Sequence, residues 1–187
     1  MDGGEAQGRR RRGARTGRAR ARRGAVPAPP PVPRWQRVLG GGWIFQGVPA
    51  EELERLALQC EERHYTPGET VFREGDAADG LYVVLSGVVR IIAQVEHGER
   101  LLSSVGPGEC FGEMGVIDGE PRSAAAVALT LASLCFVPTD PFLDLMERVS
   151  LVPMKLLALL STRLRRTNRL AAELPADLLR VDTAVDT

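Results

Sequence analysis

The amino-acid sequence predicts a mainly β fold with flanking helices (α+β). Between residues 65 and 138, short runs suited to strands alternate with turns that contain glycine or proline. A helical pattern precedes this region and two more follow it. Many short strands separated by such turns are typical of a sandwich or a barrel. A chain of 187 residues is long enough for one such domain with a sizeable core, plus tails.

Residues 1–33 differ in composition from the rest of the chain. They hold nine of the 24 basic residues but only two of the 24 acidic ones, and they end in a proline-rich run. Because they show no apolar periodicity, we expect disorder followed by a stiff, extended linker. The arginines suit binding to nucleic acid or to an acidic membrane surface. The alternatives are that they bind nothing, or that the start codon is misassigned. The remaining chain has 15 basic and 22 acidic residues, which argues against a basic, nucleic-acid-binding body.

The sequence gives no sign of secretion or membrane insertion. No apolar segment follows the arginines as in a secretory signal, and no stretch is apolar enough to span a membrane. We therefore take a cytoplasmic location as the default. Cys60, Cys110 and Cys135 are odd in number and widely spaced among apolar residues. We expect them to be reduced, buried thiols rather than disulfides or metal ligands.

A helix followed by six strands is predicted in the first two thirds of the chain. Pro49 stands at a helix start, acids occupy the next positions, and apolar residues recur at helical spacing up to Cys60. The runs that suit strands are residues 69–72, 81–85, 88–92, 100–105, 124–129 and 133–137.

The sequence of residues 110–126 predicts the end of a strand, a short helix at 113–117, a tight turn and the start of another strand. Gly112 has no side chain, so its backbone can approach a ligand closely. The first N–H groups of the short helix favour an anion. Arg122 follows the turn and presents a guanidinium fork that suits two phosphate oxygens. The segment therefore predicts a pocket for a small phosphate.

Two further residues refine this prediction. The Ser123 hydroxyl is an additional donor beside Arg122. Glu113 would repel a phosphate, so its carboxylate is better suited to accept a hydrogen bond from a hydroxyl, such as a ribose 2′-OH beside the phosphate. The alternatives are an ordinary surface arginine and an ordinary acid at a helix start.

Phe111-Gly112-Glu113 and, nine residues after the glutamate, Arg122-Ser123 resemble the phosphate-binding cassette of the cyclic-nucleotide-binding domain family (catabolite activator protein and cAMP-dependent kinase regulatory subunit type). The resemblance covers roughly residues 43–174. It implies an antiparallel β-roll (double-stranded β-helix, or jelly roll) with an N-terminal helix and a C-terminal helix pair. It also implies that Glu113 binds the ribose 2′-OH and that Arg122 and Ser123 bind the cyclic phosphate, with Phe111, Gly112 and Met114 completing the cassette.

A short helix at 141–148 and a longer one from Pro153 to about residue 174 are predicted next. Apolar residues and one threonine recur in the longer helix at steps of three and four, as in a coiled-coil seam: Leu157, Leu160, Leu164, Thr167, Ala171 and Leu174. Either two copies pair through helix 153–174 in a homodimer, or the stripe packs on its own domain. The family resemblance implies that Thr167 contacts the base, with Asn168 entering from the partner subunit. It favours cAMP as the ligand, with cGMP second.

These observations predict a cyclic-nucleotide sensor (residues 34–174) with no metal, rather than an enzyme. A metal-dependent jelly-roll enzyme of the cupin type needs a histidine cluster, whereas His64 and His97 are isolated, and no catalytic motif is present. The tail at 175–187 is too short for a helix-turn-helix, so specific nucleic-acid binding is not expected and the effector protein is unknown. The alternatives are a ligand-free protein-interaction module of the same fold and a DNA-associated transcriptional regulator that uses the arginine-rich tail.

Overall fold

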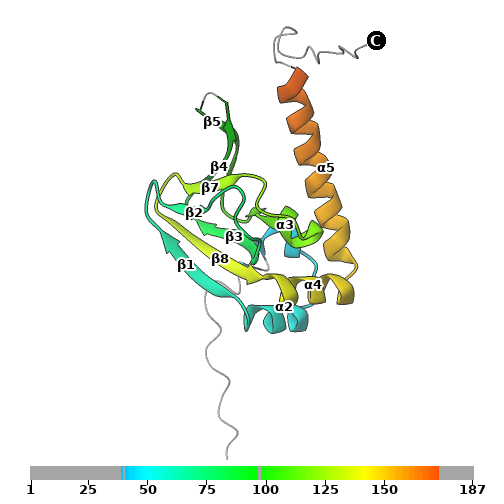
Figure 1. Cartoon of the computed structure of the whole chain (residues 1–187). Helices are drawn as coiled ribbons and strands as arrows, with labels where there is room; N and C mark the ends of the chain where they lie inside the picture. Colours follow the sequence, from blue (N-terminus) through cyan, green and yellow to red (C-terminus); the bar gives the residue numbers. More distant parts are fainter. Residues whose placement is uncertain (1–38, 40, 97, 173–187) are drawn as a thin grey trace, which may run out of the picture. The chain divides into compact units, whose positions relative to one another are not determined.

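The computed structural model describes residues 39, 41–96 and 98–172 (Figure 1). The predictions for the tails at 1–33 and 175–187, for His97 and for Leu174 lie outside these residues. No helix among the described residues has both the length and the apolar character needed to cross a lipid bilayer.

Two antiparallel sheets of four strands each form the body of the described region (Figure 1). The first has the order β1-β8-β3-β6, comprising Glu61–Tyr65, Ala132–Pro138, Gly80–Ser86 and Cys110–Phe111. The second has the order β2-β7-β4-β5, comprising Thr70–Phe72, Ala125–Ala128, Val89–Val95 and Gly98–Val105. Non-consecutive strands are neighbours in both sheets, and with the flanking helices they form the predicted antiparallel jelly roll.

Each sheet contributes side chains to a shared apolar core between the two layers. Aromatic side chains from three strands of the first sheet gather there, and Tyr82 and Phe111 stack with ring centroids 5.4 Å apart. Small residues of β7, Ala126 and Ala128, face them from the second sheet and are fully buried. The small residues leave space for the rings. The packing of rings against alanines therefore sets the distance between the two sheets next to the segment 111–124.

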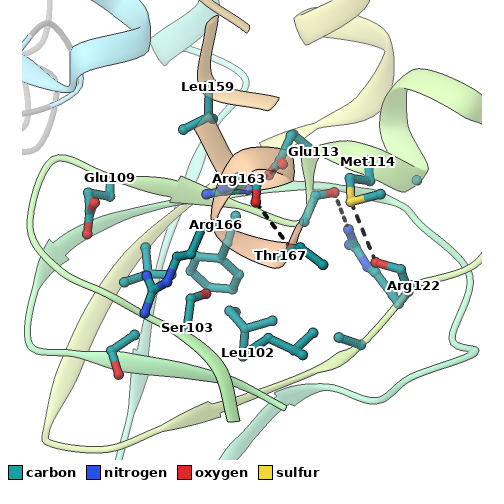
Figure 2. Close-up of a pocket in the computed structure, with 18 of the residues that line it drawn as sticks. Leu102, Ser103, Glu109, Glu113, Met114, Arg122, Leu159, Arg163, Arg166 and Thr167 are labelled. Carbon is teal, nitrogen blue, oxygen red and sulfur yellow. Dashed lines mark hydrogen bonds and ion pairs between the residues drawn. The ribbon is translucent and has the colours of Figure 1, made fainter. Parts of the chain in front are cut away.

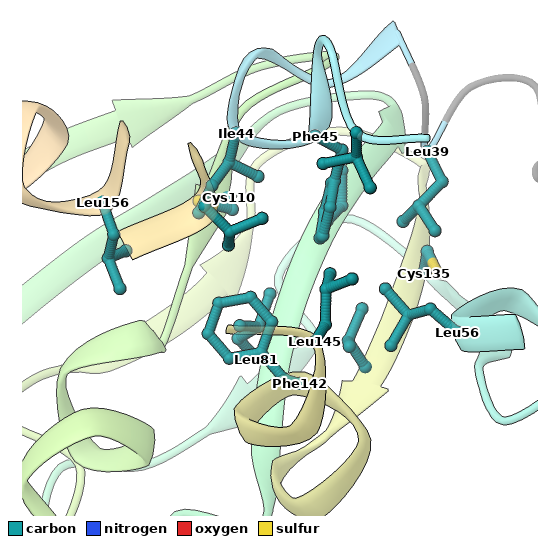
Figure 3. Close-up of a cluster of buried hydrophobic side chains, with 14 of the residues drawn as sticks. Leu39, Ile44, Phe45, Leu56, Leu81, Cys110, Cys135, Phe142, Leu145 and Leu156 are labelled. Atoms are coloured by element: carbon teal, nitrogen blue, oxygen red, sulfur yellow. The ribbon is translucent and has the colours of Figure 1, made fainter. Parts of the chain in front are cut away.

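The helices pack on the other face of the first sheet, α5 with only its N-terminal part. They are η1 (Trp43–Phe45), α2 (Ala50–Ala57), α3 (Glu113–Asp118), α4 (Thr139–Arg148) and α5 (Leu151–Ala172). Phe142 and Leu145 of α4 are completely buried against β3, and Phe142 meets the Phe45 ring edge-on at 6.4 Å (Figure 3). Leu156 anchors the beginning of α5 in the same cluster. The predicted N-terminal helix and C-terminal helix pair are confirmed.

Several boundaries differ from the predictions. The long helix begins at Leu151 rather than Pro153, because a proline is tolerated in the first turn, where its missing N–H needs no partner. Strand β1 was not predicted, and it contains His64. β1 is an edge strand paired only with β8, and its sequence is mostly polar, so the alternation that marks a half-buried strand is missing.

The three cysteines are free, as predicted. Cys110 and Cys135 are buried, whereas Cys60 is half-buried. Burial raises the pKa of the Cys110 thiol to about 12. The pKa of Cys135 is also raised, by a hydrogen bond with Cys60 and by burial. Both buried thiols therefore remain neutral at physiological pH and act as small apolar residues.

Candidate binding site

A cavity of about 290 Å³ lies between the second sheet, the segment 109–115 and helix α5 (Figure 2). Strand β5 contributes residues 102–105 to its wall, and Arg122, Ser123 and Ala124 contribute the segment that leads into β7. The lining includes three arginines and two glutamates, so its formal charge is positive by one. This excess suits a ligand with a single negative charge.

Gly112 is required by the geometry of the cavity. Its backbone is left-handed, with φ 78°, and a Cβ at this position would lie 2.7 Å from Nη1 of Arg122. The Gly112 carbonyl instead accepts a hydrogen bond from that nitrogen at 2.7 Å. The glycine thus admits the arginine side chain. The short helix predicted after it is α3, which ends at Asp118 and is followed by Gly119, a second left-handed glycine.

Arg122 is held from several sides. Its backbone N–H donates to the Asp76 carbonyl, and its own carbonyl accepts from the Gly75 N–H, both at 2.8 Å. Its Nη2 donates to Asp79 at 2.9 Å, and its guanidinium carbon lies 4.3 Å from the centroid of the Phe72 ring. Only 3% of the residue is exposed, and Nε has no hydrogen-bond partner.

Glu113 connects the cavity to helix α5. Its side chain is completely buried, and Oε1 accepts a hydrogen bond from Nη1 of Arg163, a residue of α5 (Figure 2). Nη2 of the same arginine donates to the carbonyl of Cys110, the first residue of β6. Oε2 of Glu113 has no partner. One arginine therefore ties α5 both to α3 and to the strand before it.

Seven of the eight predicted site residues line this cavity: Phe111, Gly112, Glu113, Met114, Arg122, Ser123 and Thr167. The Ser123 hydroxyl donates to the Met114 sulfur at 3.7 Å, and the Thr167 hydroxyl donates to the Arg163 carbonyl at 3.1 Å. Asn168 is exposed and does not line the cavity of its own chain.

Sequence reasoning missed several residues of the site, among them Asp79 and three polar residues of α5. Asp79, which orients Arg122, follows no recognisable motif. Thr162, Arg163 and Arg166 line the cavity from α5, and they follow Leu159, which also lines it, by three, four and seven residues, so that all lie on one helix face. That spacing was visible in the sequence and would have found all three.

The fold and the cavity together define a jelly-roll domain whose cavity suits a small, anionic ligand. Residues 62–149 match the family model of the cyclic nucleotide-binding domain, and the chain belongs to this family. Among the described residues, no group of three or more potential ligands could hold a metal ion.

Two relatives and one solved structure illustrate the similarity. The cyclic AMP receptor protein of Thermus thermophilus is 39% identical over 145 residues, which are 77% of this chain and 65% of the relative. The CRP-like cAMP-activated global transcriptional regulator of Mycobacterium tuberculosis is 34% identical over 138 residues, 73% of this chain and 62% of the relative. The crystal structure of the Thermus thermophilus catabolite activator protein superposes with a TM-score of 0.62 at 38% identity, covering 73% of this chain and 62% of that one. The chain thus spans slightly less than two thirds of these relatives.

Proposed function

We propose that the cavity binds 3′,5′-cAMP and that the domain senses this nucleotide. One observation carries the proposal. Glu113 and Arg122 are the buried charged residues of the described part of the chain, both line the cavity, and each keeps one atom without a partner. Each buried polar atom left without a partner costs about 1–3 kcal/mol, so a ligand that satisfies both atoms is favoured. A cyclic phosphate beside a ribose 2′-OH offers the required acceptor and donor.

The chemistry of the nucleotide fixes its orientation in the proposed complex. The phosphate binds at Arg122 and Ser123, and the 2′-OH donates to Glu113. Because the base leaves the ribose on the side away from the cyclic phosphate, it extends toward α5, where Thr167 is the proposed contact. Asn168 lies on the opposite face of α5, so its proposed base contact needs a second copy of the chain.

The Arg163 bridge suggests how occupancy is transmitted. A ligand that contacts Glu113 on one side and Thr167 on the other has more contacts when α3 and α5 are close. It therefore shifts the population toward that arrangement. In this proposal the signal is a change in the position of α5, and Arg163 is the residue that couples α5 to the ligand.

A homodimer through helix 153–174 is part of the proposal. Leu157 and Leu164 are 62% and 61% exposed, and they lie on the face of α5 away from the cavity. These two leucines do not pack on their own domain, which argues against the alternative of a stripe buried within one chain. Leu160 packs partly against the helix-side core, and Thr167 lines the cavity, so the predicted seam is divided between the two faces.

The names of the relatives favour a transcriptional regulator as the output, rather than a ligand-free interaction module. We propose a cytoplasmic regulatory role, without catalysis. If the arginine-rich segment is the nucleic-acid contact, the full chain will bind DNA with an affinity that falls steeply with salt and depends little on sequence. Deletion of residues 1–33 would then abolish DNA binding and leave nucleotide binding unchanged.

Isothermal calorimetry of the full chain tests the central proposal. The sample is first unfolded and refolded by dialysis to remove any co-purified nucleotide, and it is then titrated with cAMP. We expect Arg122→Ala to weaken binding roughly 100-fold, since two charge-assisted hydrogen bonds to phosphate are lost. Arg73→Ala, which removes an exposed arginine outside the cavity, is the matched control. A folded protein that takes up neither cAMP nor cGMP would refute the sensor and favour the interaction module.

A further inference from the structure

Arg166 lines the cavity but takes no part in holding the fold. Among the described residues, Arg122 and Arg163 each pair with an acid, whereas Arg166 forms no ion pair. It is also exposed, so its removal leaves the core intact. Its guanidinium donors are therefore available to a ligand.

Arg166 lies at the end of the cavity that would hold the base of the nucleotide rather than its phosphate. Figure 2 shows Arg122 at one side of the cavity and Arg166, with Glu109 and Ser103, at the opposite side. Arg166 follows Arg163, which reaches Glu113, by three residues and precedes Thr167 directly. A nucleotide with its phosphate at Arg122 and its 2′-OH at Glu113 thus directs its base toward this end.

The other polar groups at this end do not discriminate between the purines. The hydroxyls of Ser103 and Thr167 can each donate or accept a hydrogen bond. Glu109 can accept from the amino group that adenine carries at position 6 or from the one that guanine carries at position 2. Neither chemistry separates cAMP from cGMP.

Arg166 is different because it only donates. Guanine presents two adjacent acceptors, O6 and N7, which match the arginine fork in a bidentate pair, whereas adenine presents N7 beside an amino donor. We propose that Arg166 determines the base selectivity of the cavity by binding the O6/N7 edge of guanine, so that the site accepts cGMP as well as cAMP. This inference rests on the proposed nucleotide-binding function and extends it to the choice of base.

Calorimetry of the full chain with three probes, cAMP, cGMP and 3′,5′-cyclic IMP, tests the inference. Cyclic IMP carries O6 and N7 but lacks the 2-amino group, so it isolates the edge assigned to Arg166. We expect Arg166→Ala to weaken cGMP and cyclic IMP roughly 10-fold and cAMP less than about 2-fold. Arg166→Gln should improve cAMP relative to cGMP, because glutamine matches the N6/N7 edge of adenine.

Arg165→Ala and Arg169→Ala are the matched controls, since both remove the same charge from exposed positions of α5 that do not line the cavity. They should leave the ratio of the three affinities unchanged. Three outcomes would overturn the role of Arg166 and leave the sensor proposal standing. Arg166→Ala could weaken all three nucleotides equally, it could weaken none of them, or the wild-type chain could bind cAMP alone. A wild-type chain that binds none of the three would instead remove the sensor proposal, and the inference with it.

Discussion

The pair of Glu113 and Arg163 provides a quantitative test of how α5 is held to the cavity. Breaking a buried ion pair from one side costs about 3–5 kcal/mol, because the remaining charge stays buried. The Arg163 side chain is 34% exposed and Glu113 only 1%, so water weakens the interaction from one side. We therefore expect Arg163→Met to lower the free energy of unfolding by about 2 kcal/mol. That cost corresponds to a fall in the melting temperature of roughly 4–8 °C.

Urea unfolding without nucleotide, for Arg163→Met, Glu113→Gln and the double variant, measures the coupling between the two side chains. The double variant should be more stable than the sum of the single effects by about 1–2 kcal/mol. A cycle on the exposed helix pair Arg55 and Glu51, with 3.9 Å between charged atoms, is the control and should give less than about 0.5 kcal/mol. If the Glu113 and Arg163 cycle is as small as the control, the bridge does not hold α5 and the proposed route of transmission is wrong.

Three further predictions address the fold. Phe142→Ala should cost about 3–5 kcal/mol in urea unfolding, since a completely buried ring is replaced by a cavity; a cost below about 1 kcal/mol would contradict the packing. Gly80→Ala should cost about 1–3 kcal/mol, because its Cβ would lie 2.4 Å from the Val137 carbonyl, whereas Gly41→Ala, with nothing within 4 Å, should be nearly neutral. Burial raises the pKa of Cys110 to about 12 from 9.0, so iodoacetamide should label it at pH 9 far more slowly in the native than in the unfolded protein. Because the thiol ionises at lower pH in the unfolded protein than in the folded one, the stability that the neutral buried thiol contributes is complete below pH 9 and is lost between pH 9 and 12. Rapid labelling of native Cys110, detected by mass spectrometry, would refute the burial.

The core strands could be predicted from the sequence because they are continuous apolar runs. Leu81 to Val84 are almost fully buried on both faces of the first sheet, and such a run of apolar residues between glycines is unambiguous. Strand β1 could not be predicted in the same way. Its five residues include two glutamates, an arginine and a histidine, and it is held by backbone pairing to β8 rather than by a buried side-chain pattern.

The cassette was predictable because its chemistry is local, with Gly112, Glu113 and Arg122 within eleven residues of one another. The partners that hold these side chains come from distant parts of the chain. Asp79 is 43 residues before Arg122, and Arg163 is 50 residues after Glu113. No local pattern specifies such pairs, because only the packing of α5 and of the first sheet brings them into contact.

The two faces of α5 have a consequence for engineering. Each residue of an α-helix turns the chain by about 100° and advances it by about 1.5 Å. An insertion of one residue directly after Thr167 would leave the cavity unchanged but would rotate everything that follows by about 100°. A seven-residue insertion would lengthen the helix by about 10.5 Å and return the following segment to within about 20° of its original direction. A fluorescent reporter joined beyond this point should therefore give a response to nucleotide that varies with a period of 3.6 inserted residues.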